Sequence, residues 1–317
     1  MMMYMSYSYL FRLLCFGLFL GAQSIATSVP ISAQSVVVIK SRDQEAYDQV
    51  LESFVKTCGS ISMHQLVEYN LKGEEKSWGD VAKEINMTPN LILAMGPLAA
   101  QMAKEASPHI PVIFCMVSNP SRYGLAGENI VGISMDIPGA TQFALYKTVM
   151  PHLKTIGVIY DPEKSNALID EASQAAEKLG LELVKVPVSS HKTVPKALRG
   201  MLGKIDALWM VPDDTVLTTQ SFRFFLVTSF EKKLPFLAIS DIFVKVGALA
   251  TIAPDPQELG QQLCHLVTQI QNGQLDLTKA NILPPLESNL VINVKTAEKI
   301  GLIIAPEILQ SASKLYQ

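Results

Sequence analysis

Residues 155–188 read TIGVIYDPEKSNALIDEASQAAEKLGLELVKVPV, and this stretch decides the fold class. It opens with the apolar, branched run TIGVIYD (155–161), continues into an amphipathic segment at 165–180, and ends in the strand-like run LELVKVPV (181–188). Gly180 closes the helical segment, as glycine does at many helix C-termini. A strand, a helix and a second strand in this order predict a parallel β-α-β unit, because parallel strands need a crossover connection.

The same alternation continues along the chain on both sides of this unit. Strand-like runs precede it at 35–40, 90–96 and 111–117, and others follow it at 206–212 and 234–240. Helical patterns lie between these runs, and Pro97 stands at a favourable first helical position. The pattern predicts an α/β fold with two doubly wound parallel-sheet lobes, joined by a hinge and covered by helices on both faces.

The length of 317 residues suits two domains, each large enough to bury its own core. We expect an N-terminal lobe over 35–145, to which part of 250–280 returns. We expect a C-terminal lobe over 146–250, to which part of 281–317 returns. The two halves share a pattern of elements but no sequence repeat that can be aligned.

The N-terminus differs from the rest of the chain and predicts a signal peptide over residues 1–33. Its apolar run LFRLLCFGLFLGA (10–22) is shorter than a membrane span but suits a secretory signal. Small-residue cleavage sites follow Ala26 and Ala33, and an uncleaved membrane anchor is the alternative. The segment predicts export to the periplasm or another extracytoplasmic space.

Composition and cysteine spacing exclude several classes of function. The net charge is −3 and the 26 basic residues are scattered, so we expect no nucleic-acid partner. Cys15 lies inside the signal, and Cys58, Cys115 and Cys264 have neither metal-ligand spacing nor the pattern of a disulfide framework. We therefore expect these three to be buried thiols, and we expect no metal or cofactor.

Polar residues follow the strand-like runs, where ligands bind in open parallel sheets. At each single position, capping of the next helix is an alternative role. Gly96 stands out because it permits close backbone approach at the start of a helix, and Asp214 and Asp241 are candidates for binding a ligand cation. The candidate ligand-binding residues are Ser41, Gly96, Pro97, Ser118, Asn119, Asn166, Asp214, Thr215 and Asp241.

Signatures of catalysis are weak in this sequence. It contains no GxSxG elbow, no phosphate loop and no GxGxxG fingerprint, and its five histidines follow no metal-ligand spacing. Asp213 and Asp214 are a conceivable acid/base pair, but adjacent residues at a strand end usually point apart. We therefore predict a binding protein with no catalytic residues, and an enzyme on the same fold is the weaker alternative.

Several stretches resemble a known family in their order and spacing. They are LILAMGPLAAQMAKEA, IPVIFCMVSNPSRYGL, NIVGISM, IDALWMVPDDTV, LPFLAISDIFVKVGALATI and the tail LVINVKTAEKIGLIIAPEIL. Over roughly residues 86–310 the chain resembles ABC-transporter substrate-binding proteins of the periplasmic binding protein type I fold, in the tryptophan and aromatic-amino-acid branch. Two positions depart from the family pattern: Pro97 replaces a threonine, and Asn119 replaces the aspartate of an SDP turn.

The resemblance implies a Venus-flytrap receptor that closes on a small polar ligand, for which an amino acid is the natural candidate. The start of the 97–105 helix and Ser118 would hold an anionic group, and Asp214 or Asp241 an ammonium. Phe243, Met116 or Trp209 would supply an apolar wall, although Trp209 lies mid-strand and fits the core better. The expected partner of this monomer is an ABC permease, and a membrane sensor that uses the same cleft for signalling is the alternative.

Overall fold

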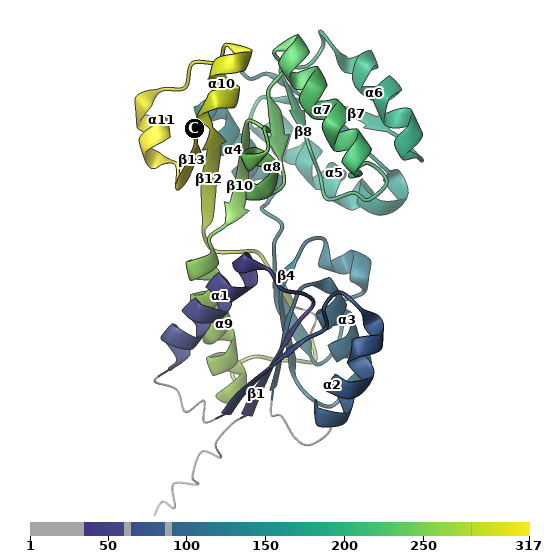
Figure 1. Cartoon of the computed structure of the whole chain (residues 1–317), viewed down its shortest axis with the longest axis vertical. Helices are drawn as coiled ribbons and strands as arrows, with labels where there is room; N and C mark the ends of the chain where they lie inside the picture. The colour runs from purple at the N-terminus through teal and green to yellow at the C-terminus, as the bar shows by residue number, and fades with distance from the viewer. Residues whose placement is uncertain (1–34, 60–64, 86–90, 280) are drawn as a thin grey trace, which may run out of the picture. The chain divides into compact units, whose positions relative to one another are not determined.

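The computed structural model describes residues 35–59, 65–85, 91–279 and 281–317. The predicted signal peptide lies outside these residues. The described chain forms two open α/β sheets with helices on their faces, as predicted (Figure 1). None of the described helices is long and apolar enough to cross a membrane.

The first sheet has the strand order β11-β5-β4-β3-β1-β2, and all its pairings are parallel. Helices α1 and α9 cover one face, and α2 and α3 cover the other (Figure 1). The strands are β1 (Ser35–Lys40), β2 (Gln65–Asn70), β3 (Leu91–Met95), β4 (Val112–Val117), β5 (Ile130–Ser134) and β11 (Asn281–Leu283). The helices are α1 (Glu45–Cys58), α2 (Trp78–Ile85), α3 (Pro97–Ala106) and α9 (Pro256–Gln271).

Strand β1 shows why these apolar runs become central strands. Val36 and Val38 are buried in the cluster beneath α1 and α9, whereas Val37 and Ile39 are buried in the cluster on the opposite face. Because successive strand side chains point to opposite faces, a strand covered on both sides needs apolar residues at every position. The continuous branched run therefore places β1 in the sheet interior.

The second sheet has the order β13-β12-β10-β9-β8-β6-β7. Its strands are β6 (Thr155–Tyr160), β7 (Glu182–Pro187), β8 (Ala207–Trp209), β9 (Phe236–Ala238), β10 (Ala250–Pro254), β12 (Ser288–Asn293) and β13 (Lys314–Tyr316). Its helices are α4 (Gly139–Val149), α5 (Pro162–Lys178), α6 (Val194–Met201), α7 (Thr219–Lys232), α8 (Asp241–Lys245), α10 (Val294–Ile300) and α11 (Pro306–Ser311).

Strand β12 is the exception to the predicted parallel pattern, because it pairs antiparallel with β10. The chain leaves the second sheet after β10, adds α9 and β11 to the first sheet, and then returns. It re-enters where it left, so that Ser288 of β12 lies opposite Pro254 of β10. A strand that starts beside the end of its neighbour must run in the opposite direction.

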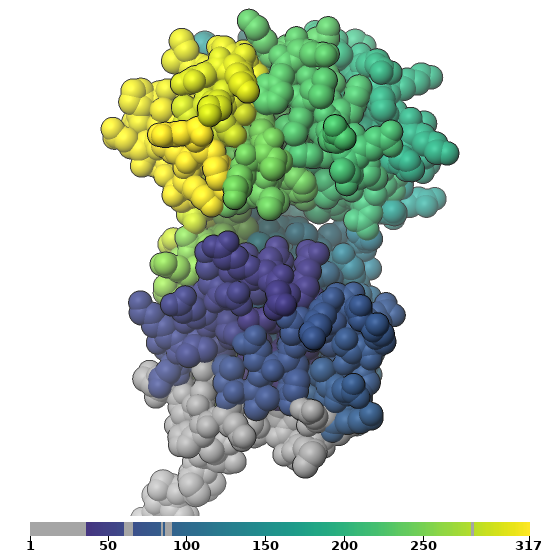
Figure 2. Space-filling view, viewed as in Figure 1, coloured from purple at the N-terminus to yellow at the C-terminus, as the bar shows by residue number. Residues whose placement is uncertain are grey.

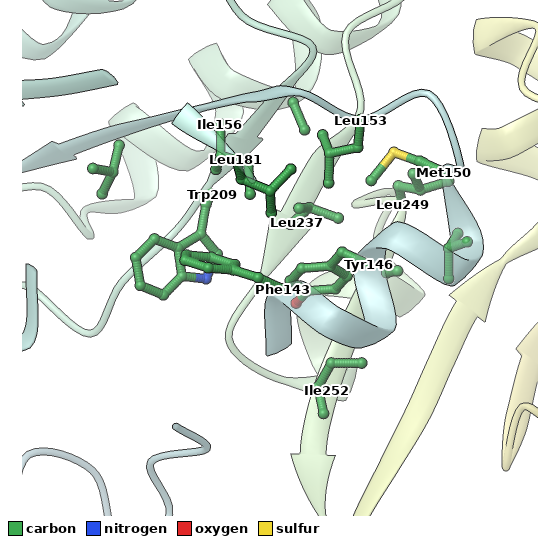
Figure 3. Close-up of a cluster of buried hydrophobic side chains, with 14 of the residues drawn as sticks. Phe143, Tyr146, Met150, Leu153, Ile156, Leu181, Trp209, Leu237, Leu249 and Ile252 are labelled. Atoms are coloured by element: carbon green, nitrogen blue, oxygen red, sulfur yellow. The ribbon is translucent and has the colours of Figure 1, made fainter. Parts of the chain in front are cut away.

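A cluster of large side chains joins α4 to the second sheet (Figure 3). Phe143 of α4 packs edge-on against Trp209 of β8, with ring centroids 5.0 Å apart, and Tyr146 is fully buried beside them. The Trp209 indole nitrogen donates a hydrogen bond to Gln142 at 3.0 Å, so Trp209 belongs to this core. The boundary expected between the two lobes, at residues 145 and 146, falls inside α4.

The prediction of three buried thiols is wrong for two of the cysteines. Cys58 at the end of α1 and Cys264 in α9 form a disulfide, with their Cα atoms 5.5 Å apart. Gly260 brings the two helices together, because a side chain there would overlap the backbone of Val50. Cys115 remains a thiol, and its burial raises its pKa. The 206-residue separation of the bonded pair explains why spacing alone did not reveal it.

We expect reduction of this disulfide to destabilise the protein. A crosslink across so long a loop restricts the unfolded chain, and its loss costs about 2–5 kcal/mol of unfolding free energy. Urea denaturation with and without reductant checks this, with Cys58→Ser/Cys264→Ser as the matched variant. The double variant should show no further response to reductant, and Cys115→Ala should retain the full response.

Candidate functional site

A cavity of about 340 Å³ lies where loops at the carboxyl ends of the strands of both sheets meet. Parallel α/β sheets bind ligands at this edge. The first sheet and its helices contribute Arg42, Gln44, Tyr47, Pro97, Met116, Ser118, Arg122, Tyr123 and Met135, and the second contributes Pro212, Asp214, Leu217 and Ile239. Among these lining residues only Arg42, Arg122 and Asp214 carry a charge.

The floor of the cavity on the first-sheet side is built around Gly96. This residue has φ +91°, and a Cβ atom there would lie 2.2 Å from the Tyr47 hydroxyl and 2.7 Å from Ser41 Oγ. Ser41 Oγ accepts a hydrogen bond from the Ala99 N–H at 2.9 Å, so β1 supplies a cap for the start of α3. Ser41 and Gly96 therefore lie behind the cavity wall, and Tyr47 and Pro97 form the wall itself.

Arg42 is the unpaired cation of this cavity. Its neighbour Lys40 is buried and forms ion pairs with Asp48 at 2.6 Å and Glu68 at 2.7 Å. Arg42 has no ion pair among the described residues, and it lies close enough to the Tyr47 hydroxyl to influence its pKa. Burial raises the pKa of Tyr47, and the charge of Arg42 opposes that rise.

Ser118 reaches the cavity because the end of β4 is irregular. The register between β4 and β5 shifts after Phe114, and Met116 and Asn119 both adopt left-handed backbone conformations, with φ +59° and +50°. Such bulges re-aim side chains, and strained non-glycine residues cluster at functional sites. The Asn119 N–H donates to Asp136 at 2.7 Å, and its side-chain amide donates to the Lys164 carbonyl at 3.5 Å.

On the second-sheet side, Asp213 organises the loop that carries Asp214. The Asp213 side chain is fully buried and accepts hydrogen bonds from the Asp161 N–H at 2.7 Å and the Ser165 hydroxyl at 2.8 Å. It also accepts from the Thr215 N–H at 2.9 Å, and the Thr215 hydroxyl donates to Asp161 at 2.7 Å. That hydroxyl bond lowers the pKa of Asp161. Thr215 thus braces the loop and does not line the cavity.

Asp214 points the other way and pairs with Arg122 from the opposite side of the cavity. The hydrogen bond from Arg122 lowers the pKa of Asp214, and the same bond raises the pKa of Arg122. The pair is accessible to water, with 30% of the Arg122 side chain and 57% of the Asp214 side chain exposed.

Asn166 and Asp241 lie away from this cavity. Asn166 is exposed on α5 and donates to Asp170 at 2.8 Å. Asp241 at the start of α8 pairs with Lys314 at 2.8 Å and accepts a hydrogen bond from the Tyr316 hydroxyl. The C-terminal segment therefore lies against α8, and its yellow surface adjoins the green one in Figure 2.

The structure brings Pro97, Ser118 and Asp214 together among the predicted residues, with Gly96 and Ser41 directly behind them. The expected apolar wall is supplied by Met116, whereas Phe243 packs on Phe222 with ring centroids 4.7 Å apart. Trp209 lines a smaller cavity of about 40 Å³, which shares Ser118, Met135, Pro212 and Ile239 with the larger one.

Sequence reasoning missed the cavity residues Arg42, Tyr47 and Arg122. Arg42 follows the first strand-like run together with Ser41 and Asp43, so the strand-end rule does point to it, but only Ser41 was retained as a candidate ligand-binding residue. Tyr47 has the helical spacing of a core residue and is indeed buried, yet it also lines the cavity. No sequence signal marks Arg122.

The sequence model described as "ABC transporter substrate binding protein" matches residues 35–316. The chain belongs to this family. Proteins of the family work outside the cytoplasm and hand a small molecule to an ABC transporter. The family assignment confirms the predicted resemblance and the general class of function.

Three relatives of this substrate-binding protein carry more specific descriptions. A tyrosine-binding protein of Clostridioides difficile strain R20291 is 29% identical over 229 residues, which cover 70% of this chain and 66% of that protein. A Streptococcus pneumonia domain crystallised with L-Trp has a TM-score of 0.65 at 23% identity, over 90% of this chain and all of that one. The ligand-free, open structure of a Clostridium difficile substrate-binding protein with adhesive properties has a TM-score of 0.73 at 22% identity. The match covers 90% of this chain and 99% of that one.

We expect Gly96→Ala to damage this substrate-binding protein more than an ordinary glycine substitution. The added methyl group would clash with the Tyr47 hydroxyl and with Ser41. In addition, the backbone of residue 96 has a positive φ, which disfavours any side chain. Strain and overpacking together should lower the unfolding free energy by about 2–5 kcal/mol. Gly301→Ala is the matched control, because its φ is +77° with open space around it, and should cost about 1–2 kcal/mol. Equal losses in urea denaturation would contradict the close contact.

Proposed function

We propose that this substrate-binding protein captures an L-amino acid with an apolar, aromatic-sized side chain and delivers it to an ABC permease. The observation that carries the proposal is the charge arrangement of the 340 Å³ cavity. It combines an unpaired cation, Arg42, with a single lining acid, Asp214, on the opposite side. An amino-acid zwitterion is the small molecule whose two charges match this pair.

Arg42 is suited to the ligand carboxylate. A guanidinium presents a planar set of donors that matches a carboxylate, and the Tyr47 side chain lines the same wall of the cavity. The start of α3 lies in the same wall and adds the favourable potential of a helix N-terminus. Pro97 lacks an N–H, so Arg42 is the principal donor on this side.

The remaining wall is suited to an apolar side chain. Met116, Met135, Leu217 and Ile239 line it, and methionine adapts its shape to different partners. A volume of about 340 Å³ lies within the range typical of small-molecule sites. Support for an aromatic ligand comes from the tyrosine-binding relative and from the structural relative crystallised with L-Trp.

Delivery would follow closure of the two halves around the bound amino acid, because the cavity takes its walls from both sheets. Closure sequesters the ligand and presents a distinct form of the protein to a permease. We propose that residues 1–33 direct export, that the protein acts as a monomer, and that the ligand is released chemically unchanged.

The role of Arg42 is tested with Arg42→Ala. Loss of the carboxylate partner should weaken L-tyrosine, L-phenylalanine or L-tryptophan binding by about 10- to 150-fold, since hydrogen bonds to charged groups contribute about 1.5–3 kcal/mol. Isothermal titration calorimetry measures the change. Arg223→Ala removes the same charge from an exposed position on α7 outside the cavity and should bind like the unaltered protein.

Two outcomes would contradict the proposed function. One is that no amino acid stabilises or titrates the folded, unaltered protein. The other is that the bound amino acid is recovered chemically altered, which would support the enzyme alternative.

A further inference from the structure

The ion pair between Arg122 and Asp214 joins the two sides of the cavity. Arg122 lies in the turn after β4 of the first sheet, and Asp214 lies in the loop after β8 of the second. Both side chains line the cavity, so their pairing takes place inside the proposed binding site. A second contact between the two sides, from the Asn119 side-chain amide to the Lys164 carbonyl, has a donor–acceptor distance of 3.5 Å.

The charges of the cavity give this pair a consequence for ligand choice. Arg42 and Arg122 contribute two positive charges, and Asp214 contributes the single negative charge of the lining. A ligand carboxylate meets Arg42 without competition. Asp214 is the single carboxylate of the lining that a ligand ammonium could meet, and Arg122 already engages one of its two oxygens, Oδ2.

We propose that Arg122 is a specificity-determining residue that competes with the ligand ammonium for Asp214. The ammonium of an amino acid must compete with the guanidinium for this one carboxylate, so its binding weakens the existing pair, whereas the corresponding carboxylate without an amine binds with the pair intact. Arg122 therefore lowers the affinity of the cavity for amino acids relative to its affinity for the analogues that lack the amine. The inference rests on the proposed function, because it assumes that the ligand carboxylate lies at Arg42.

The surroundings of Arg122 allow this exchange. Water reaches both partners, so their pairing is of the exposed kind that contributes little net free energy and can be replaced. The Arg122 guanidinium also lies 5.3 Å from the centroid of the Tyr123 ring, another residue of the lining. This cation–π contact gives the released guanidinium a place to remain.

The test compares two ligands that differ only in the amine, L-phenylalanine and 3-phenylpropanoate. Their dissociation constants are measured by calorimetry on the full protein and on Arg122→Gln. We expect Arg122→Gln to bind L-phenylalanine about three- to fivefold more tightly, which corresponds to removal of an exposed ion pair. Binding of 3-phenylpropanoate should stay within twofold. If phenylalanine is a poor ligand, L-tyrosine and 3-(4-hydroxyphenyl)propanoate replace the pair.

Three further variants and one control separate competition from other roles. Arg122→Lys keeps a competing cation and should resemble the unaltered protein. Asp214→Asn should remove the preference for the amine, and a further Arg122→Gln change in that background should have no effect. Arg199→Gln is the matched control, because Arg199 lies over the Phe224 ring and not in the cavity.

The outcomes distinguish the inference from the proposed function. Weaker binding of both ligands by Arg122→Gln would show that Arg122 holds the carboxylate, which overturns the competition while the proposed function stands. An unchanged preference in Arg122→Gln, with melting temperature preserved, also overturns it. Failure of both ligand pairs to bind the unaltered protein would overturn the proposed function, and the inference with it.

Discussion

A buried carboxylate, Asp213, fixes the geometry on the second-sheet side of the cavity. It forms no ion pair within the described part of the chain and accepts hydrogen bonds from N–H and hydroxyl donors that follow β6 and β8. Burial of a carboxylate costs free energy unless its oxygens are hydrogen-bonded. Separation of these two loops would break those bonds, so the loops are held together. Because Asp213 points into the protein, Asp214 is directed outward to the cavity. Two adjacent acids thereby acquire separate roles, one in holding the loop and one in facing the ligand.

The first-sheet side reaches similar rigidity by different means. There the tight contact of Gly96 with Tyr47 and Ser41 sets the distance between α1, β1 and the start of α3. The left-handed Met116 turns the end of β4 toward the same place. The second-sheet side is held by hydrogen bonds and the first-sheet side by close packing. The exposed charges of Arg122 and Asp214 are therefore the part of the site that can rearrange. Adaptable charges on a rigid frame favour discrimination by charge placement.

The sequence predicted the fold well because its signals are local. The branched run of β1 and the β-α-β unit at 155–188 each specify their own element, and their sum specifies two doubly wound sheets. The site was predicted only in part, since strand ends are local but side-chain partners are not. Asp241 follows a strand as a binding residue should, yet Lys314 and Tyr316 engage it from more than seventy positions away.

The cysteine pair and the cavity are connected through α1. Its first turn carries Tyr47, which lines the cavity beside Arg42, and its last residue is Cys58. The disulfide ties that end to α9, which follows directly on the crossing from β10 of the second sheet. Helix α1 is thus bonded at its last residue to the middle of α9, and its first turn contributes to the proposed carboxylate side of the site. The disulfide and the close packing of α1 on α9 therefore hold in place the helix that puts Tyr47 in the cavity wall.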